Sequence, residues 1–243
     1  MAAAWIGLAG GIAAALLSAV VAVRQSRMDE QLARVQVDLD ADLHRRTALL
    51  DRDLRAEEVL TRYRQPLAAA AFDLQSRLYN LLELGFLDHF GGDHPRAQEA
   101  MRTTLFRIAQ YFGWSEILRR DIQFLSFPED GDSRRVAGLQ AEIAKRFLTD
   151  AYGPALMIWS DEQRAIGERM IVEEHGKVLC MGYATFGERC ETAFGVWLTR
   201  VEAELPEPSA HQRLREIQHL LCELVELLDG AHVRYAAADL QRA

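Results

Sequence analysis

The chain has 243 residues, a length that allows one or two domains with a substantial buried core. Hydrophobic residues make up 49% of the chain and only 6 residues are proline, so a long disordered or collagen-like protein is excluded. The net charge of −8 argues against nucleic acid as a partner, because a surface that binds phosphates is positively charged.

Residues 2–23 form the first recognisable element. These 22 residues include no charged side chain. As a helix rising ~1.5 Å per residue they would be about 33 Å long, which matches the hydrocarbon core of a bilayer. A cleaved signal peptide is the alternative, but no Lys or Arg precedes the run and the run is longer than a usual signal-peptide core. We therefore expect a retained single-pass transmembrane anchor over residues 1–23.

Basic residues directly after this anchor indicate its orientation. Arg24 and Arg27 follow the apolar run, so the positive-inside rule places the N-terminus outside and the C-terminal domain in the cytoplasm, at an inner (plasma) membrane. Within the anchor, Gly7 and Gly11 form a GxxxG motif that would let a second helix approach closely. Chance spacing in an alanine-rich helix is an equally good explanation of that motif.

Residues 24–61 contain no Gly and no Pro and predict a charged helical stalk. Its apolar residues recur at intervals of eleven, which favours a nearly straight or slightly right-handed coiled coil over a left-handed one. The two series are Met28, Leu39 and Leu50, and Leu32, Leu43 and Leu54. Such a narrow apolar face needs a partner, which is either a second copy of the chain or the rest of the chain folding back.

Residues 62–243 predict a helical bundle domain. Pro66 is expected to mark a kink or boundary, at the first turn of a new helix. Expected helices cover 67–90, 96–126 with a break near Gly113, 133–149, 160–174, 188–204 and a last helix ending before Gly230. Capping boxes are expected at Ser160 with Gln163 and at Ser209 with Gln212, and residues 177–187 read as a loop or a short extended piece. The fold class is therefore all-α, and a doubly wound nucleotide-binding domain is disfavoured.

Common catalytic and metal motifs are absent from the sequence. It contains no GxGxxG, P-loop, HExxH, GxSxG, EF-hand or CxxC pattern. The three cysteines suit a reducing compartment. Two histidine-containing groups, Asp88–His94 and His219 with Cys222, fit zinc spacing only loosely, and surface or core roles explain them better. We predict no metal and no cofactor.

Three charged residues are the candidates for ligand binding. Arg77 interrupts an apolar helical stretch, and Arg164 and Glu168 lie on the helix that begins at Ser160. They could line a pocket for an anionic ligand, since arginine recognises anions with two parallel hydrogen bonds. An internal ion-pair network explains them better than a ligand pocket does, because buried charges need partners whether or not a ligand is present.

Three segments resemble a family of uncharacterised bacterial proteins. They are RYRQPLAAAAFDLQSRLYNLL (62–82), IAQYFGWSEILRRDIQFL (108–125) and DEQRAIGERM (161–170). The resemblance covers most of residues 60–230 and implies an all-helical fold. It implies no activity, substrate or functional residue.

Three functions fit these features. The first is a membrane-anchored helical scaffold or sensor that binds a protein or small ligand at the cytoplasmic face without catalysis. The second is an enzyme of unrecognised type with a pocket between helices. The third is a structural membrane spacer that forms a homo-oligomer through its anchor or stalk. The expected partners are thus the membrane, a second copy, and an unidentified protein or small molecule, but not nucleic acid.

Overall fold

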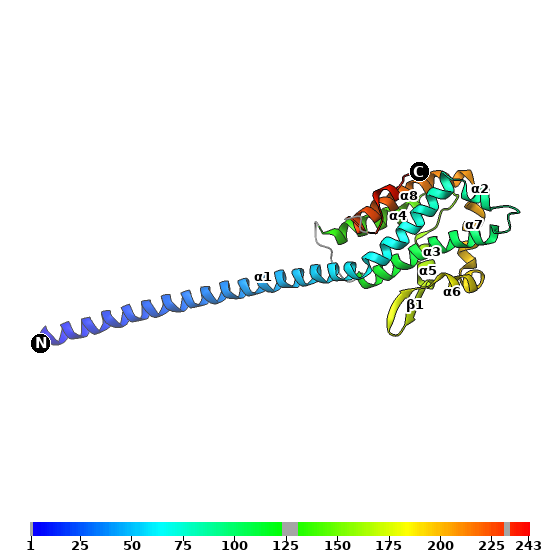
Figure 1. The fold of residues 1–243 in the computed structure, drawn as a ribbon. Coiled ribbons are helices and arrows are strands. Elements are labelled where there is room, and N and C mark those ends of the chain that lie inside the picture. Colours follow the sequence, from blue (N-terminus) through cyan, green and yellow to red (C-terminus); the bar gives the residue numbers. More distant parts are fainter. Residues whose placement is uncertain (1, 123–130, 231–233) are drawn as a thin grey trace. The chain divides into compact units, whose positions relative to one another are not determined.

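The computed structural model describes the backbone of residues 2–122, 131–230 and 234–243, with side chains from Arg24 onward except at scattered positions. Packing divides the chain into two units, Met1–Asp51 and Arg52–Ala243, and each is described by itself. The elements, in chain order (Figure 1), are α1 (Ala2–Leu82), α2 (Phe86–Phe90), α3 (Ala97–Ile122), α4 (Asp132–Leu148), α5 (Ser160–Arg169), β1 (Ile171–Glu174), β2 (Lys177–Cys180), α6 (Tyr183–Arg189), the π-helix η1 (Cys190–Phe194), α7 (Gly195–Glu204), the 3₁₀-helix η2 (Pro208–Ala210), α8 (His211–Leu228) and the 3₁₀-helix η3 (Ala237–Asp239). This mostly helical content confirms the all-α class.

Helix α1 does not end where the proline predicted a boundary. It runs for 81 residues with Pro66 inside it. A proline inside a helix costs about 3 kcal/mol, because it removes one backbone hydrogen bond and crowds the preceding turn. The residues after Pro66 offset this cost by packing: Leu67, Ala70 and Ala71 are all buried in the core of the second unit. The boundary that Pro66 predicted was therefore wrong, and the alternative of a kink there stays a prediction.

The predicted anchor, residues 2–23, lies outside the residues whose side chains are described, and it stays a prediction together with Gly7 and Gly11. In the fully described part of the chain, we find no helical stretch with the length and hydropathy of a membrane span. The described stalk residues of the first unit carry uncovered apolar side chains, and Met28, Leu39 and Leu50 are each at least 60% exposed.

Two glycines let α3 and α5 cross at close range. A Cβ atom added at Gly113 would lie 2.7 Å from the Cβ of Met170, and one added at Gly167 would lie 2.6 Å from the carbonyl oxygen of Phe112. Real Cβ atoms do not approach so closely, so both positions require glycine. Gly113 therefore serves as a contact point within a continuous helix, and the break predicted there was wrong.

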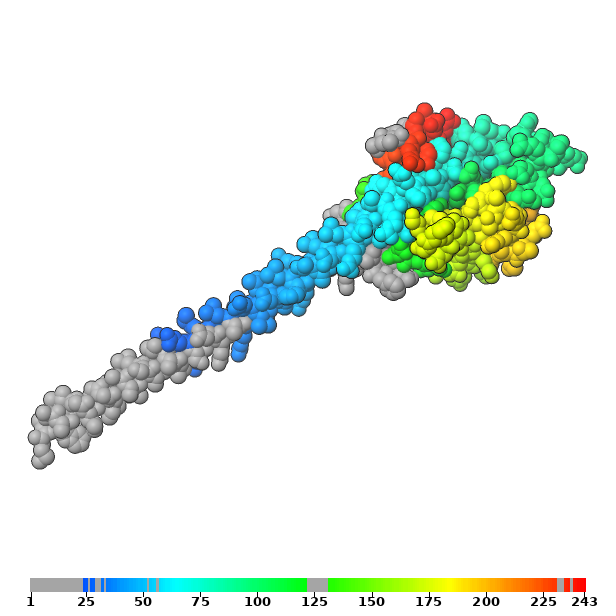
Figure 2. Space-filling model, turned by 60° about the horizontal axis from the view of Figure 1, so that its bottom comes forward, coloured from blue at the N-terminus to red at the C-terminus, as the bar shows by residue number. Residues whose placement is uncertain are grey.

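A β-hairpin replaces the end of the helix expected over 160–174. Strands β1 and β2 pair antiparallel, with Glu174 opposite Lys177. The two-residue turn between them has positive φ at His175 (52°) and Gly176 (71°), which suits the right-handed twist of a hairpin. Ile171 and Val172, β-branched residues, favour the extended backbone. In the space-filling view the hairpin and α6 (yellow) lie beside α3 (green) (Figure 2), and both pack against it.

Helix α8 supplies one face of the core. Its apolar stripe is buried as the periodicity predicted, at Leu214, Ile217, Leu221, Leu224, Val225 and Leu228. The capping box expected at Ser209 was wrong: the Ser209 hydroxyl donates a hydrogen bond to Glu207 instead, and η2 leads directly into α8. The helix packs mainly against α4.

Candidate functional site

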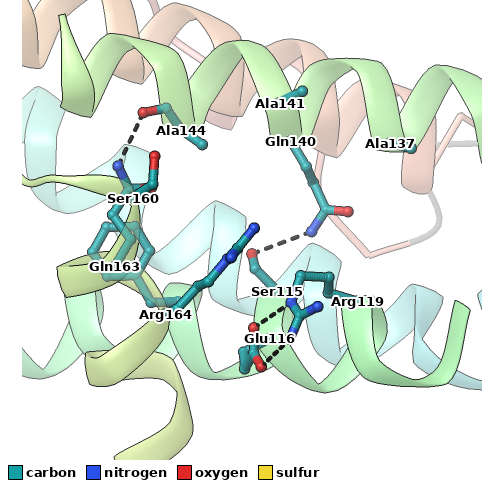
Figure 3. A pocket seen from close by; sticks show the side chains of 11 residues that line it. Ser115, Glu116, Arg119, Ala137, Gln140, Ala141, Ala144, Ser160, Gln163 and Arg164 are labelled. Atoms are coloured by element: carbon teal, nitrogen blue, oxygen red, sulfur yellow. Dashed lines mark hydrogen bonds and ion pairs between the residues drawn. The ribbon is translucent and has the colours of Figure 1, made fainter. Parts of the chain in front are cut away.

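A cavity of about 340 Å³ lies between α3, α4 and α5. Its apolar wall consists of Phe112 and three alanines of α4, which are Ala137, Ala141 and Ala144. Polar side chains complete the lining from all three helices (Figure 3): Ser115, Glu116 and Arg119 from α3, Gln140 from α4, and Ser160, Gln163 and Arg164 from α5. A mainly apolar cleft with a few polar groups, formed between helices, has the usual composition of a small-molecule site.

The position of α5 depends on the irregular connection 149–159 that precedes it. Arg213 of α8 is fully buried and donates hydrogen bonds from its guanidinium to carbonyl oxygens around that connection. The acceptors are Arg146 (2.6 Å), Phe147 (3.3 Å), Thr149 (2.7 Å), Gly153 (2.6 Å) and Ala155 (2.9 Å). Burial lowers the pKa of Arg213, while more distant acidic groups oppose that shift. One side chain thus supplies hydrogen bonds to the free carbonyl groups at the end of α4 and fixes the path of the chain into α5.

Glutamate side chains also bind the connection 149–159. Leu156 has a positive φ of 56°, an unfavourable conformation for a residue with a side chain. Its N–H donates to the carboxylate of Glu204 at 2.7 Å, which holds the backbone in place. Arg200 pairs with Glu204 and also with Glu162, both at 3.2 Å. These contacts join α7 to the start of α5.

The cap of α5 lies one residue earlier than the sequence predicted. The N–H of Trp159 donates to the carboxylate of Glu162 at 2.7 Å, so the capping carboxylate is Glu162 and the predicted pair of Ser160 with Gln163 was wrong. Gln163 instead donates from Nε2 to the carbonyl oxygens of Ala144 (3.0 Å) and Ile158 (2.8 Å). Ser160 is thereby left exposed at the mouth of the cavity.

A buried carboxylate sits in the floor of the cavity. Glu116 is only 3% exposed and accepts hydrogen bonds from Arg119 (both 2.7 Å) and Arg120 (2.8 Å). Burial alone would raise the pKa of Glu116, but the hydrogen bonds from the two arginines outweigh it and lower that pKa. Arg120 also pairs with Glu168 at 3.0 Å. Glu168 is therefore a partner of Arg120 and does not line the cavity.

The charges around this site leave one cation unbalanced. Glu116 and Glu168 offset Arg119 and Arg120, whereas the guanidinium of Arg164 forms no hydrogen bond or ion pair with any described residue. Figure 3 shows the Arg164 side chain extending from α5 into the space between α3 and α4, toward Ser115 and Gln140. Gln140 donates to the Ser115 hydroxyl at 3.2 Å, so both groups are held in place. The site can therefore bind one negative charge beside an apolar wall.

The three predicted ligand residues do not share one site. Arg164 lines the cavity described above, Glu168 belongs to the ion-pair network beneath it, and Arg77 lines a different cavity near α2. Sequence analysis missed Glu116, Arg213 and Glu204. The only sequence signal for Arg213 was a charged residue one position before the apolar Leu214 of α8.

Among the residues that the structure describes, no three His, Cys, Asp or Glu side chains come together in a group that could hold a metal ion. His89 and His94 lie near each other with ring centroids 6.2 Å apart, and Phe90 packs edge-on against both.

No family model, curated protein or solved structure matches the chain. The resemblance of three segments to uncharacterised bacterial proteins stays a prediction and adds no activity.

Proposed function

We propose that the chain is a membrane-anchored helical sensor module whose cytoplasmic domain binds a small anionic ligand in the cavity between α3, α4 and α5. The observation that supports this most directly is the exposed side chain of Arg164, which lines an apolar-walled cavity of about 340 Å³ and has no hydrogen-bond or ion-pair partner among the described residues. The proposal includes no catalytic step. We call this cavity, together with Arg164, the cavity site.

The lining suggests the chemistry of the ligand. Arg164 would bind a carboxylate or phosphate group through two parallel hydrogen bonds. The hydroxyls of Ser115 and Ser160 offer further donors, while Phe112 and the alanines of α4 favour an apolar body. A ligand that combines one negative charge with an apolar part fits both features.

The anchoring part of the proposal rests on the sequence. Residues 2–23 are uncharged and Arg24 follows at once, which favours a single span with the second unit on the cytoplasmic side. A fusion of alkaline phosphatase to the C-terminus should be inactive, while a C-terminal fluorescent protein should be bright at the membrane. Active phosphatase would contradict the orientation, and a fully soluble fusion would contradict the anchor.

Native mass spectrometry of the full chain, released from detergent micelles, tests ligand binding. We expect a mass excess that disappears on denaturation, is lost in Arg164→Gln and is kept in Arg169→Gln. Arg169 is the matched control, because it is an exposed arginine on the same helix and does not line the cavity. An adduct whose mass and occupancy are the same in Arg164→Gln as in the unmodified chain would contradict the cavity site. A chain that shows no mass excess, even after incubation with cytosolic metabolites, would also contradict the cavity site.

The exposed apolar row of the stalk favours a second role, the pairing of two copies. Leu39 and Leu43 are 60% and 54% exposed and belong to the eleven-residue series. In isolated membranes treated with copper phenanthroline as the oxidant, Leu39→Cys should form a disulfide between two copies, whereas Ala41→Cys, on the opposite face of the helix, should not. Equal cross-linking of both variants would indicate random collision instead of a specific pair.

A further inference from the structure

A second cavity, of about 210 Å³, lies where the C-terminal part of α1 meets α2 and α3. Arg77 of α1 lies over the ring of Phe86, with its guanidinium carbon 3.9 Å from the ring centroid. Phe90, Arg96 and Glu99 also line this cavity. None of these residues belongs to the cavity site.

Arg77 lacks the partners that a buried guanidinium requires. Its Nη1 atom is buried without a hydrogen-bond partner, and the rest of the group forms no hydrogen bond or ion pair within the described chain. A buried donor without a partner destabilises the fold. We therefore expect a water molecule or a ligand to accept a hydrogen bond from this group. Burial and the nearby charge of Arg107 both lower the pKa of Arg77, as expected for an uncompensated cation.

The neighbouring charged groups are already paired. Arg107 binds Asp73 through a short ion pair and also donates to Gln110. Glu99 accepts a hydrogen bond from the Tyr183 hydroxyl at 2.7 Å. These contacts leave two arginines, Arg77 and Arg96, against the single carboxylate of Glu99 on the cavity wall.

The balance of charges on the cavity wall indicates the charge and shape of the ligand. One net positive charge suits a monoanion better than a doubly charged phosphate, because Glu99 would repel the second negative charge. The flat fork of a guanidinium matches the two oxygens of a carboxylate. Phe86 and Phe90 add aromatic surface for an apolar body.

We propose that this cavity is a second ligand site, which binds the carboxylate of a small organic acid with an aromatic or other apolar body. Arg77 is the primary anchor of the carboxylate, and Arg96 at the rim adds attraction. The site is independent of the cavity site and does not rest on the function proposed above.

Binding of benzoate to the full chain in detergent tests the proposal, with benzamide as the uncharged isostere and inorganic phosphate as the competing anion. The measurements are made by equilibrium dialysis in an Arg164→Gln background, so that the cavity site does not contribute. We expect one saturable benzoate site, an affinity at least tenfold weaker for benzamide and for phosphate, and a loss of at least tenfold on Arg77→Gln. Arg96→Gln should weaken benzoate severalfold.

Arg77→Lys keeps the positive charge but loses the planar pair of donors of the guanidinium. It keeps the proposal testable if Arg77→Gln fails to fold. It should bind benzoate more weakly than the parent while retaining the parent's melting temperature. Absence of saturable benzoate binding, preference for phosphate, or full affinity in Arg77→Lys and Arg77→Gln would each overturn the assignment. If the cavity site proposed above is wrong, the native mass will be the same in Arg164→Gln as in the unmodified chain. That result does not affect the benzoate measurement.

Discussion

The guanidinium of Arg213 donates a hydrogen bond to the carbonyl oxygen of Gly153 at 2.6 Å, across 60 residues of sequence. Four more carbonyl oxygens share the same side chain. A fully buried arginine whose hydrogen bonds all go to carbonyls, with no carboxylate among the acceptors, acts as a fixed donor array for the backbone. The route of the chain from α4 into α5, and hence the location of Arg164, depends on this array.

Arg213→Met should destabilise the second unit by about 3–5 kcal/mol, because it leaves several buried carbonyl groups without donors. Urea unfolding followed by circular dichroism measures the loss. Arg215→Met is the matched control on the same helix, since Arg215 is 43% exposed and, among the described residues, pairs with Glu83 alone. That control should cost less than about 1 kcal/mol. Equal losses in the two variants would show that the carbonyl contacts contribute little.

Gly167→Ala should destabilise the fold by about 2 kcal/mol or more, since the added methyl group would collide with backbone and force α3 and α5 apart. Gly138→Ala, at an exposed helical position with nothing within 4 Å of the added Cβ, should stabilise the fold by about 0.5–1 kcal/mol. The same urea titration reports both variants. Opposite signs are the expected signature of the close crossing, and a stabilising Gly167→Ala would refute it.

Glu116 makes stability depend on acid pH. Its pKa is lowered in the folded chain below the ordinary 4.5, so its stabilising contribution is complete above pH 4.5 and declines as pH falls through the lowered folded pKa. The urea midpoint, measured from about pH 6 down to about pH 3, should therefore fall less steeply in Glu116→Gln than in the unmodified chain. Glu142→Gln, at a 48% exposed position, should leave the slope unchanged. Parallel slopes in all three chains would exclude Glu116 as the cause.

The thiols of the native chain should react slowly. Burial raises the pKa of Cys180 to about 12 and that of Cys222 to about 11, and burial also raises the pKa of Cys190. At pH 8 the thiolate fraction is therefore far below that of an ordinary cysteine. Alkylation with iodoacetamide, followed by mass spectrometry, should be at least tenfold slower for Cys180 and Cys222 in the folded chain than after unfolding in urea, and it should also be slower for Cys190. Rapid modification of Cys180 in the folded chain would contradict its burial.

Helical periodicity predicted much of the second unit and failed where contacts distant in sequence decide the structure. The buried stripe of α8 followed directly from the spacing of Leu214, Ile217 and Leu221. Pro66 and Gly113 looked like helix breakers because propensity treats each residue alone. Packing of the following residues keeps α1 helical at Pro66, and close contact with Met170 makes Gly113 a crossing point.

The candidate site was only partly predictable for the same reason. Arg164 was selected as a charge in an amphipathic helix, and it does line a cavity. Its grouping with Arg77 and Glu168 failed because sequence spacing does not report which elements pack together. Glu116, four residues before Arg120, carried a weak signal as an i,i+4 pair. The position of Arg213 beside Leu214 gave no indication of its role, since its acceptors lie 58 to 67 residues away.

The geometry of residues 149–159 depends on side chains of three later helices, Glu162 of α5, Glu204 of α7 and Arg213 of α8. Turns within the connection satisfy some of its backbone groups, whereas the N–H of Leu156 and the carbonyl oxygens of Gly153 and Ala155 depend on α7 and α8. The path from α4 into α5 is therefore complete only when α7 and α8 are docked. We expect a chain shortened before α8 to lose the ordered geometry of this connection, which lies far upstream of the missing helix.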